Sequence, residues 1–363
     1  MRIIFLSLIL VFIGCSSEKV IHETFIKNQD IVFTDTIEIK NQSIALSALN
    51  PKLYGDSLLF TMDGAYQDLF MYNLKTARLI IWDNDFISGT RLPNISLHDY
   101  IFHKGYIYLF YKSIYKVYQF TIDGDFVQKI TIEQPNKGSN AEGREFFEIT
   151  EEGNFIINQE MDGYKSLQSL FQNTKTIGVY RNTGNALKSF GDFPESYHRG
   201  GIVLSKFYNY MLDKKMVFTL NSVGVPRLRQ YDVTGSLQNS YRFKLDDFNE
   251  QIYYFENSPF DSKINDQITQ IGRDVVRGDS LIYFSYQRYD NENPPEGYET
   301  LEFKLGVLDL AKKSLNTFKI GGNNLVGTTK RMIPQIYDGK IYFLLSPNDT
   351  EKEQLILVES KIQ

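Results

Sequence analysis

Histidines are the first candidates for chemistry in this chain, because imidazole exchanges protons near neutral pH and also binds metals. The sequence contains only four of them, and His22 lies in a polar N-terminal stretch. His98 and His103 are expected on or beside one strand with their side chains on opposite faces, so they do not form a chelating pair. His198, beside Arg199, is left as the one candidate for a general acid or base.

Motifs for other kinds of catalysis are missing from the sequence. No Cys and His residues have the spacing of a zinc site, and neither a glycine-rich phosphate loop nor a G-x-S-x-G nucleophile turn occurs. The acidic stretches at 83–85 (Asp-Asn-Asp) and 290–292 (Asp-Asn-Glu) lack the ligand spacing of a known calcium loop, so we interpret them as solvated turns. We therefore expect no metal and no other cofactor.

Arginines give a second possible site. Five of them lie near the start of strands that we expect to be innermost in the fold: Arg91, Arg144, Arg199, Arg273 and Arg331. A ring of guanidinium groups at the mouth of a central channel could bind a carboxylate or a phosphate. Ion pairs with neighbours such as Glu145 and Asp274 are the alternative reading of the same residues.

Six tyrosines lie on the long segments that connect the expected strands, namely Tyr164, Tyr197, Tyr253, Tyr254, Tyr289 and Tyr298. Such rings could stack on sugars or anchor a protein partner, and packing within the loops is the alternative. From both groups we take Arg91, Arg144, Arg199, Arg273, Arg331, Tyr197 and Tyr289 as the candidate ligand-binding residues.

A repeated unit positions these residues. It is a tight turn followed by an apolar, β-prone run, as in YDGKIYFLL at 337–345, and related copies are YGDSLLF at 54–60, HKGYIYLF at 103–110, EGNFII at 152–157, DKKMVF at 213–218 and RGDSLIYF at 277–284. Short apolar strands surround each copy, with Asp-Gly or Thr-Gly hairpin turns between several of them. The pattern predicts six units, most of which have four strands.

The ends of the chain suggest how these units close. The last unit has three strands, and the first is preceded by a spare strand at 34–40. We predict an all-β, six-bladed β-propeller of four-stranded antiparallel blades, in which this N-terminal strand completes the last blade and removes its free edge. A row of β-sandwich domains would not explain one spare and one missing strand.

Connection lengths distinguish the two rims of such a propeller. The long segments are 134–145, 159–175, 192–200, 246–267 and 287–300, and all of them fall on the rim opposite the short glycine turns. Long loops in a compact domain are often functional, so we expect this rim to be the binding face. Neutral insertions on a tolerant surface are the alternative.

The N-terminus has the features of an export signal. Arg2 precedes a largely apolar run at 3–13, which is too short to span a bilayer, and the only cysteine of the chain follows at Cys15. Residues 12–15 (Phe-Ile-Gly-Cys) resemble the lipobox of bacterial lipoproteins, in which the cysteine carries lipid. We expect a signal peptide at 1–14, a tether at 15–29 and a propeller at 30–363.

Composition limits the possible partners. A net charge of −5 lacks the basic surface that nucleic acid requires, so we expect no nucleic-acid partner. With its repeats and its lipobox, the chain resembles uncharacterised bacterial lipoproteins with six-bladed, TolB-like propellers. The resemblance implies a lipid-anchored place in the cell envelope, at the outer membrane, and a non-catalytic role in binding an envelope protein or a glycan. A hydrolase or lyase acting on a glycan or lactone is the alternative.

Overall fold

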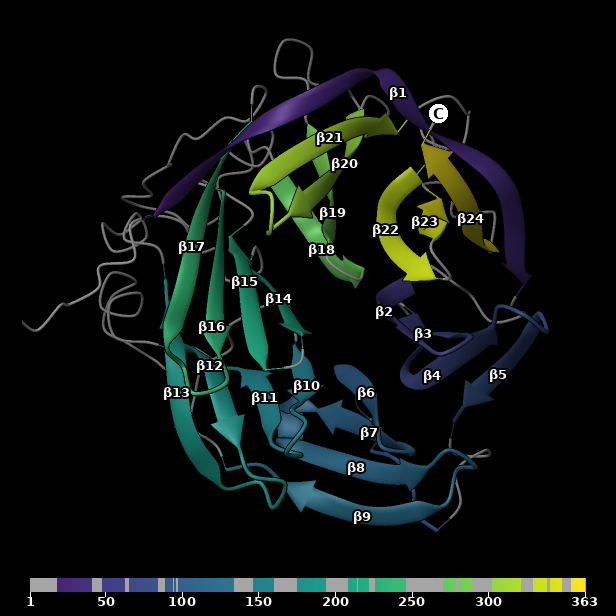
Figure 1. The fold of residues 1–363 in the computed structure, drawn as a ribbon. Helices are drawn as coiled ribbons and strands as arrows, with labels where there is room; N and C mark the ends of the chain where they lie inside the picture. The colour runs from purple at the N-terminus through teal and green to yellow at the C-terminus, as the bar shows by residue number, and fades with distance from the viewer. Residues whose placement is uncertain are drawn as a thin grey trace, which may run out of the picture.

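Antiparallel strands that follow one another along the chain build nearly all of the described structure (Figure 1). The structure, a computed structural model, describes residues 18–40, 48–62, 65–83, 89–93, 95, 97–133, 146–159, 175–193, 208–213, 215–221, 226–245, 270–278, 281–288, 302–320, 329–337, 340–347 and 354–362. Within these ranges, the one helical element is a short 3-10 turn, η1 (Lys112–Ile114). The fold is therefore all-β, as the sequence predicted.

The first half of the chain forms three separate four-stranded sheets. The first contains β2 (Ala48–Tyr54), β3 (Ser57–Met62), β4 (Ala65–Asn73) and β5 (Arg78–Trp82). The second contains β6 (Asp99–His103), β7 (Tyr106–Tyr111), β8 (Lys116–Thr121) and β9 (Phe126–Thr131). The third contains β10 (Phe147–Ile149), β11 (Phe155–Asn158), β12 (Lys175–Tyr180) and β13 (Ala186–Asp192).

The second half repeats the same meander, but its strands belong to one continuous hydrogen-bonded sheet of twelve strands. One part contains β14 (Tyr208–Asp213), β15 (Met216–Asn221), β16 (Arg227–Asp232) and β17 (Leu237–Lys244). The next contains β18 (Gln270–Gly278), β19 (Leu281–Arg288), β20 (Glu302–Asp309) and β21 (Ser314–Ile320). The last contains β22 (Thr329–Tyr337), β23 (Lys340–Pro347) and β24 (Gln354–Ile362).

Strand β1 (Lys19–Lys40) joins these three parts along the outside of the molecule (Figure 1). Residues 19–22 run parallel to β17, and residues 23–25 and 30–31 run parallel to β21. Residues 31–40 then run antiparallel to β24, which otherwise pairs only with β23 among the described strands. The predicted spare strand at 34–40 is thus paired with the strand that we expected it to accompany.

The expected tether at 15–29 is wrong for most of its length. Residues 19–29 belong to β1, and their pairing with β17 and β21 begins at Lys19. The segment looked like a tether because its composition is mostly polar. A strand that covers an outer edge needs only an occasional buried side chain, however, and Ile21 provides one at 2% exposure.

The sheets succeed one another around a common axis, with β2, β6, β10, β14, β18 and β22 nearest to it (Figure 1). Strands inside a sheet are covered on both faces, so β11 is buried at every position, whereas the outer strands β9 and β13 are largely exposed. Continuous apolar runs are typical of strands that are covered on both faces. The fold is therefore propeller-like.

Apolar side chains fill each interface between consecutive sheets. Leu59, Leu69 and Trp82 of the first sheet pack with Tyr100 and Ile107 of the second in one buried cluster. A similar cluster joins the second sheet to the third, and another joins the third sheet to strands β15 and β16. Two more clusters lie in the second half of the chain. One packs β15–β17 against β19–β21, and the other packs β20 and β21 against β1 and β23. Burying a Leu or Phe side chain contributes about 1.5–3 kcal/mol, so these interfaces dominate the stability.

Short turns lie at one end of every meander, as predicted. Glycines with positive φ occur in the turns between first and second strands or between third and fourth strands, namely Gly55, Gly105, Gly124, Gly153, Gly184 and Gly235. Gly184 also approaches the neighbouring sheet: a Cβ there would lie 1.9 Å from the carbonyl oxygen of Thr131, and its own carbonyl accepts a 2.8 Å hydrogen bond from the N–H of Glu133. The Gly184 turn therefore fastens the third sheet to the second.

Candidate functional site

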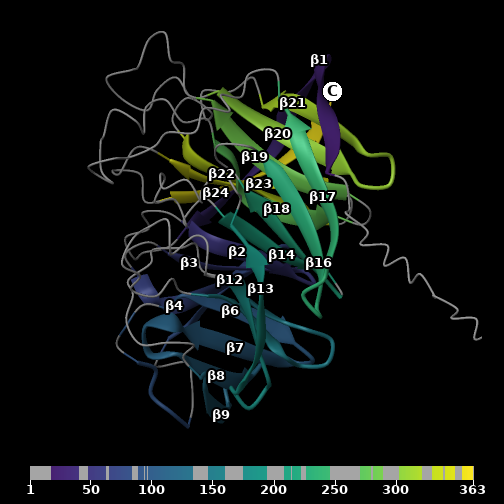
Figure 2. The same cartoon turned by 90° about the vertical axis from the view of Figure 1, so that its left-hand side faces the viewer.

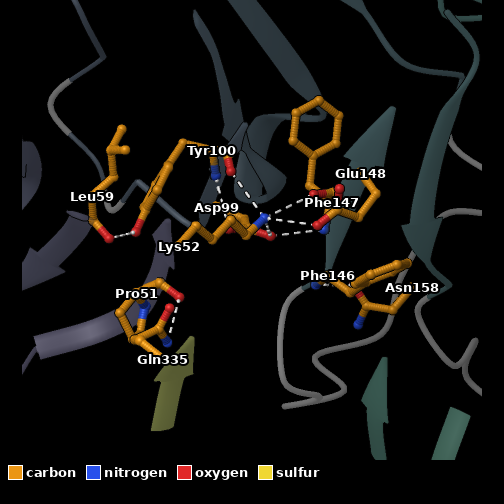
Figure 3. Close-up of polar contacts among 10 residues, drawn as sticks. All are labelled: Pro51, Lys52, Leu59, Asp99, Tyr100, Phe146, Phe147, Glu148, Asn158 and Gln335. Carbon is orange, nitrogen blue, oxygen red and sulfur yellow. Dashed lines mark hydrogen bonds and ion pairs between the residues drawn. The ribbon is translucent and has the colours of Figure 1, made fainter. Parts of the chain in front are cut away.

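Three charged side chains from the innermost strands meet near the axis: Lys52 of β2, Asp99 of β6 and Glu148 of β10 (Figure 3). We call them the axial cluster. Each comes from the first strand of its own sheet, and β6 lies next to both β2 and β10. The meander places these strands innermost, so the three sheets bring one charged residue each to the same point.

The ammonium group of Lys52 has four oxygen partners. Its Nζ lies 3.0 Å from Oδ2 of Asp99 and 3.4 Å from Oε1 of Glu148, and it donates to the carbonyl oxygens of Tyr100 at 2.9 Å and Phe147 at 3.1 Å. A lysine has three N–H donors, so this set satisfies its donor capacity. Lys52 thereby connects its own strand to both β6 and β10.

Asp99 is almost completely buried, with 2% of its surface exposed, and both of its oxygens are used. Oδ1 accepts the N–H of Tyr100 at 2.9 Å, and Oδ2 accepts the N–H of Phe147 at 2.8 Å in addition to Lys52. A carboxylate buried in this way is stable only because these donors replace water. Breaking the pair by removing one partner would leave a buried charge uncompensated.

Burial and mutual attraction act in opposite directions on the protonation of the cluster. Burial raises the pKa of Asp99 and of Glu148 above their ordinary values, although Lys52 pulls both back down. Burial alone would lower the pKa of Lys52, but the two carboxylates outweigh it, and the net result is a raised pKa. Lys52 therefore stays charged near neutral pH.

Neighbouring polar contacts extend the network around the axis. The hydroxyl of Tyr100 donates to the carbonyl oxygen of Leu59 at 2.8 Å, and Oδ1 of Asn158 accepts the N–H of Phe146 at 3.1 Å (Figure 3). Burial, followed by the charge of Asp99, raises the pKa of Tyr100 well above its ordinary value, so this phenol remains a donor. The first contact joins the second sheet to β3 of the first sheet, and the second contact lies within the third sheet, beside β10.

The axial cluster is suited to positioning strands and to presenting charge, with little capacity for proton transfer. Lys52 and Asp99 are hydrogen-bonded to each other and to backbone groups. The side chains of Lys52 and Glu148 still keep 26% and 19% of their surface exposed, so the cluster faces accessible space with one more carboxylate than ammonium groups. Its excess charge favours a cationic or hydroxyl-bearing group over an anion.

The predicted site residues are only partly described. Arg91 is exposed in the segment before β6, and Arg273 and Arg331 lie in β18 and β22, both innermost strands. Arg144, Arg199, Tyr197, Tyr289, Cys15 and the catalytic candidate His198 lie outside the described residues. The ring of arginines therefore stays a prediction.

Two other histidines have separate environments. Nδ1 of His98 accepts the N–H of Lys112 at 3.1 Å, and its Nε2 lies 3.2 Å from Oγ of Ser113. His103 packs edge-on against Tyr108 instead. Among the residues that the structure describes, no group of three or more His, Cys, Asp or Glu side chains could hold a metal ion, and no helix is both long and apolar enough to cross a membrane.

Sequence reasoning missed the axial cluster, although a signal was available. Lys52, Asp99 and Glu148 each lie a few residues before a Gly turn, inside a strand that the meander must place innermost. A charged residue in such a strand is costly unless it has a partner, and three of them in consecutive sheets can supply one another. The arginines nearer the strand starts form a second charged pattern in the same region of the sequence.

Comparisons with known proteins show which folds are similar, but they assign no function. No family model matches the chain, and no curated protein matches it. A solved member of the DUF4221 family from Bacteroides vulgatus is similar in structure, with a TM-score of 0.65 and 14% identity over 92% of this chain and 98% of that one. A Bacteroides fragilis protein described as exported gives a TM-score of 0.61 and 14% identity over 95% and 100%. YjhT gives a TM-score of 0.51 and 10% identity over 90% and 99%. At these identities the likeness concerns the fold alone.

Proposed function

We propose that this protein is an envelope lipoprotein that acts as a non-catalytic binding or scaffolding module, through the rim of the ring that carries its long connections. The distribution of connection lengths is the observation that carries this proposal. The strand bounds leave residues 132–146, 159–174, 193–207, 245–269 and 289–301 between strands, and each segment joins either a fourth strand to the next first strand or a second strand to a third. In an antiparallel meander these connections share one end, opposite the short glycine turns.

The packing of the sheets that carry this rim supports a role in binding and not in catalysis. Aromatic and aliphatic clusters fill the interfaces between sheets, and the charges of the axial cluster are satisfied mainly by one another and by backbone groups. Binding sites are often carried by loops on a rigid scaffold. We therefore assign recognition to the loop residues and assign positioning of the sheets to Lys52, Asp99 and Glu148.

We further propose that the sheets form a six-bladed propeller of the TolB-like kind, in which residues 31–40 of β1 complete the last blade beside β24. Pairing of this segment with β24 and the place of β22 beside β2 support a closed ring. Nε2 of Gln335 in β22 also lies 3.5 Å from the carbonyl oxygen of Pro51 in β2, which is consistent with contact between the last sheet and the first. Closure would remove the two free edges that an open array exposes.

The envelope location rests on the N-terminal sequence. Residues 12–15 match a lipobox closely enough that we propose lipid attachment at Cys15 and an outer-membrane location. The structural likeness to a protein described as exported agrees with a place outside the cytoplasm. Cys15→Ser should move the protein from the membrane pellet to the soluble fraction, and equal membrane association of both forms would show that the anchor assignment is wrong.

The ligand is proposed to be an envelope protein or a glycan, bound by arginines at the starts of the innermost strands and by arginines and tyrosines of the long connections. We would neutralise Arg144, Arg199 and Arg273 together by substitution with Gln and compare this variant with wild type in a pull-down from envelope extract and on a glycan array. The variant should lose a partner or glycan that the wild type binds. Equal binding by both proteins would remove the arginines from the proposal.

The same experiment separates binding from the hydrolase or lyase alternative. His198→Ala should leave binding intact if the protein is a binding module. If any array glycan or a lactone substrate is turned over, and the histidine variant loses that turnover while it keeps its affinity, then the enzyme reading is correct instead.

A further inference from the structure

The N-terminal end of β1, three residues after Cys15, is fixed to the outer edge of the ring. Glu18, the first described residue, pairs with Arg227: its Oε2 lies 3.1 Å from Nη2 of that residue, and its Oε1 accepts the hydroxyl of Ser240 at 3.3 Å. Nζ of Lys19 donates to Oδ1 of Asn239 at 2.7 Å. Residues 19–22 then pair with β17, which is the outermost strand of its meander.

The position of this edge is visible in both views. β1 passes along the circumference beside β17 in Figure 1, and the same two strands lie together in the view turned by 90° in Figure 2. The innermost strands β14 and β18 lie deeper in the ring. The N-terminal end of β1 therefore starts at the side of the ring, away from its axis.

Little chain separates Cys15 from this edge. Three residues can span at most about 11 Å when fully extended. The headgroup layer on one side of a bilayer takes up roughly 5–8 Å of such a distance. Acyl chains on Cys15 would thus hold Glu18 within a few Å of the membrane surface.

We propose that the ring lies against the membrane by its side, at the edge formed by residues 19–22, 227–229 and 237–244, and with neither rim facing the bilayer. This inference rests on the proposed lipid anchor at Cys15. We call these residues the anchor edge, and their intended partner is the phospholipid surface into which the acyl chains insert.

Charge supports this placement. The anchor edge contains five basic residues and no acidic one: Lys19, Arg227, Arg229, Arg242 and Lys244. Glu18 offsets the charge of Arg227 through their ion pair, while Arg229 donates to the carbonyl oxygen of Asp192 and Lys19 to the neutral side chain of Asn239. Basic side chains are attracted to an anionic lipid surface, and this attraction supplements the acyl chains. Val20, with 50% of its surface exposed, adds an apolar side chain to the same edge.

The consequence for function is that both rims stay accessible to ligands. A ring lying on one rim would hide either the short turns or the long connections. A ring held by its side presents the long connections laterally, where they can reach a partner that is embedded in or attached to the same membrane.

Site-specific fluorescence quenching can test the placement. Cys15 is the only cysteine and would be blocked by lipid, so an introduced cysteine can be labelled alone. We would label Val20→Cys on the anchor edge, Arg78→Cys at the start of β5 and Lys104→Cys on a short turn, all of which are exposed positions. The purified lipoprotein would be reconstituted in vesicles of neutral and anionic phospholipid that carry a headgroup quencher. Val20→Cys should be quenched roughly twofold or more above the other two, because the quenchers lie within the headgroup layer.

Other outcomes identify which step is wrong. Failure of the intact lipoprotein to float with the vesicles overturns the anchor, and this inference with it. Flotation with strongest quenching at Lys104→Cys, or with equal quenching at all three positions, overturns the placement alone. A flexible linker of about ten residues inserted before Glu18 adds roughly 17 Å of reach and should abolish the difference between labels without preventing flotation.

Discussion

The two halves of the molecule are joined in different ways. Among the described residues, the sheets from β2 to β13 share no backbone ladder and are held together mainly by side chains, namely apolar clusters and the axial cluster. The strands from β14 to β24 form one hydrogen-bonded sheet because β1 pairs with β17, β21 and β24 in turn. One half is therefore fastened near its axis by buried charge, and the other is fastened at its circumference by backbone pairing.

This difference teaches where each half is vulnerable. Buried charges tolerate the loss of a partner poorly, since the remaining charge has no water to replace it. Backbone pairing depends little on side-chain identity, but it requires the whole pairing strand to be present. Single substitutions should therefore act most strongly at the axis, and a deletion should act most strongly at the circumference.

The largest effect is expected from removing β1. A protein that starts at Gln42 would expose the edges of β17, β21 and β24 and would lose the buried side chains of Ile21 and Ile31. We expect aggregation, or a fall in Tm on the order of 10 °C, because exposed strand edges pair with other chains. Light scattering after size exclusion and a thermal melt would measure both. A protein that starts at Glu18 is the control, and a match between the shorter form and this control would refute the role of β1.

Asp99→Ala should cause the largest loss from a single substitution. It leaves Lys52 without its buried partner and leaves the N–H of Phe147 without an acceptor. Loss of one member of a buried ion pair costs about 3–5 kcal/mol of unfolding free energy. Urea denaturation would measure it, and Asp123→Ala in an exposed turn should change stability by less than about 0.5 kcal/mol. Equal effects of the two substitutions would mean that the axial cluster does not hold the first half together.

Gly184→Ala and Gly55→Ala compare two turns with the same type of backbone. Both glycines have positive φ, so each substitution carries a strain of about 1–2 kcal/mol. Only at Gly184 would the added Cβ meet backbone atoms of the preceding sheet, whereas nothing lies within 4 Å at Gly55. Gly184→Ala should therefore lower the unfolding free energy clearly more in urea denaturation. Similar losses would show that this turn does not fasten the second sheet to the third.

The strands were predictable because each depends on local pattern, whereas the site depends on which strands become neighbours. The repeated unit at 103–110 contains most of β7, and the spare strand at 34–40 was found from the strand count. Residues 19–29 were misjudged because edge strands bury few side chains. The contact of Lys52 with Asp99 and Glu148 joins residues far apart in the chain, and each looked like an ordinary surface charge by itself.

The pH dependence of stability offers a finer test of the axial cluster. Burial raises the pKa of Glu148 above its ordinary 4.5, Lys52 opposes that shift and Asp99 adds to it. A group with a higher pKa in the folded state stabilises the protein below its unfolded pKa, and this stabilisation is lost as pH rises through the folded pKa. The stability of wild type minus that of Glu148→Gln should therefore fall as pH rises above about 4.5. Urea denaturation at several pH values would measure the difference, and a difference that grows with pH would contradict it.

The smallest effect is expected at the circumference, from Glu18→Gln. Glu18 pairs with Arg227, but their side chains remain 33% and 19% exposed, and water can replace the lost contact. A partly exposed ion pair contributes about 0–1 kcal/mol, and the ladder between residues 19–22 and β17 is unaffected by the substitution. A double-mutant cycle with Arg227→Gln would isolate the pair energy. A coupling above about 2 kcal/mol would mean that charge, in addition to backbone pairing, fixes β1 to the other strands. Both halves would then depend on ion pairs, and they would differ only in how strongly.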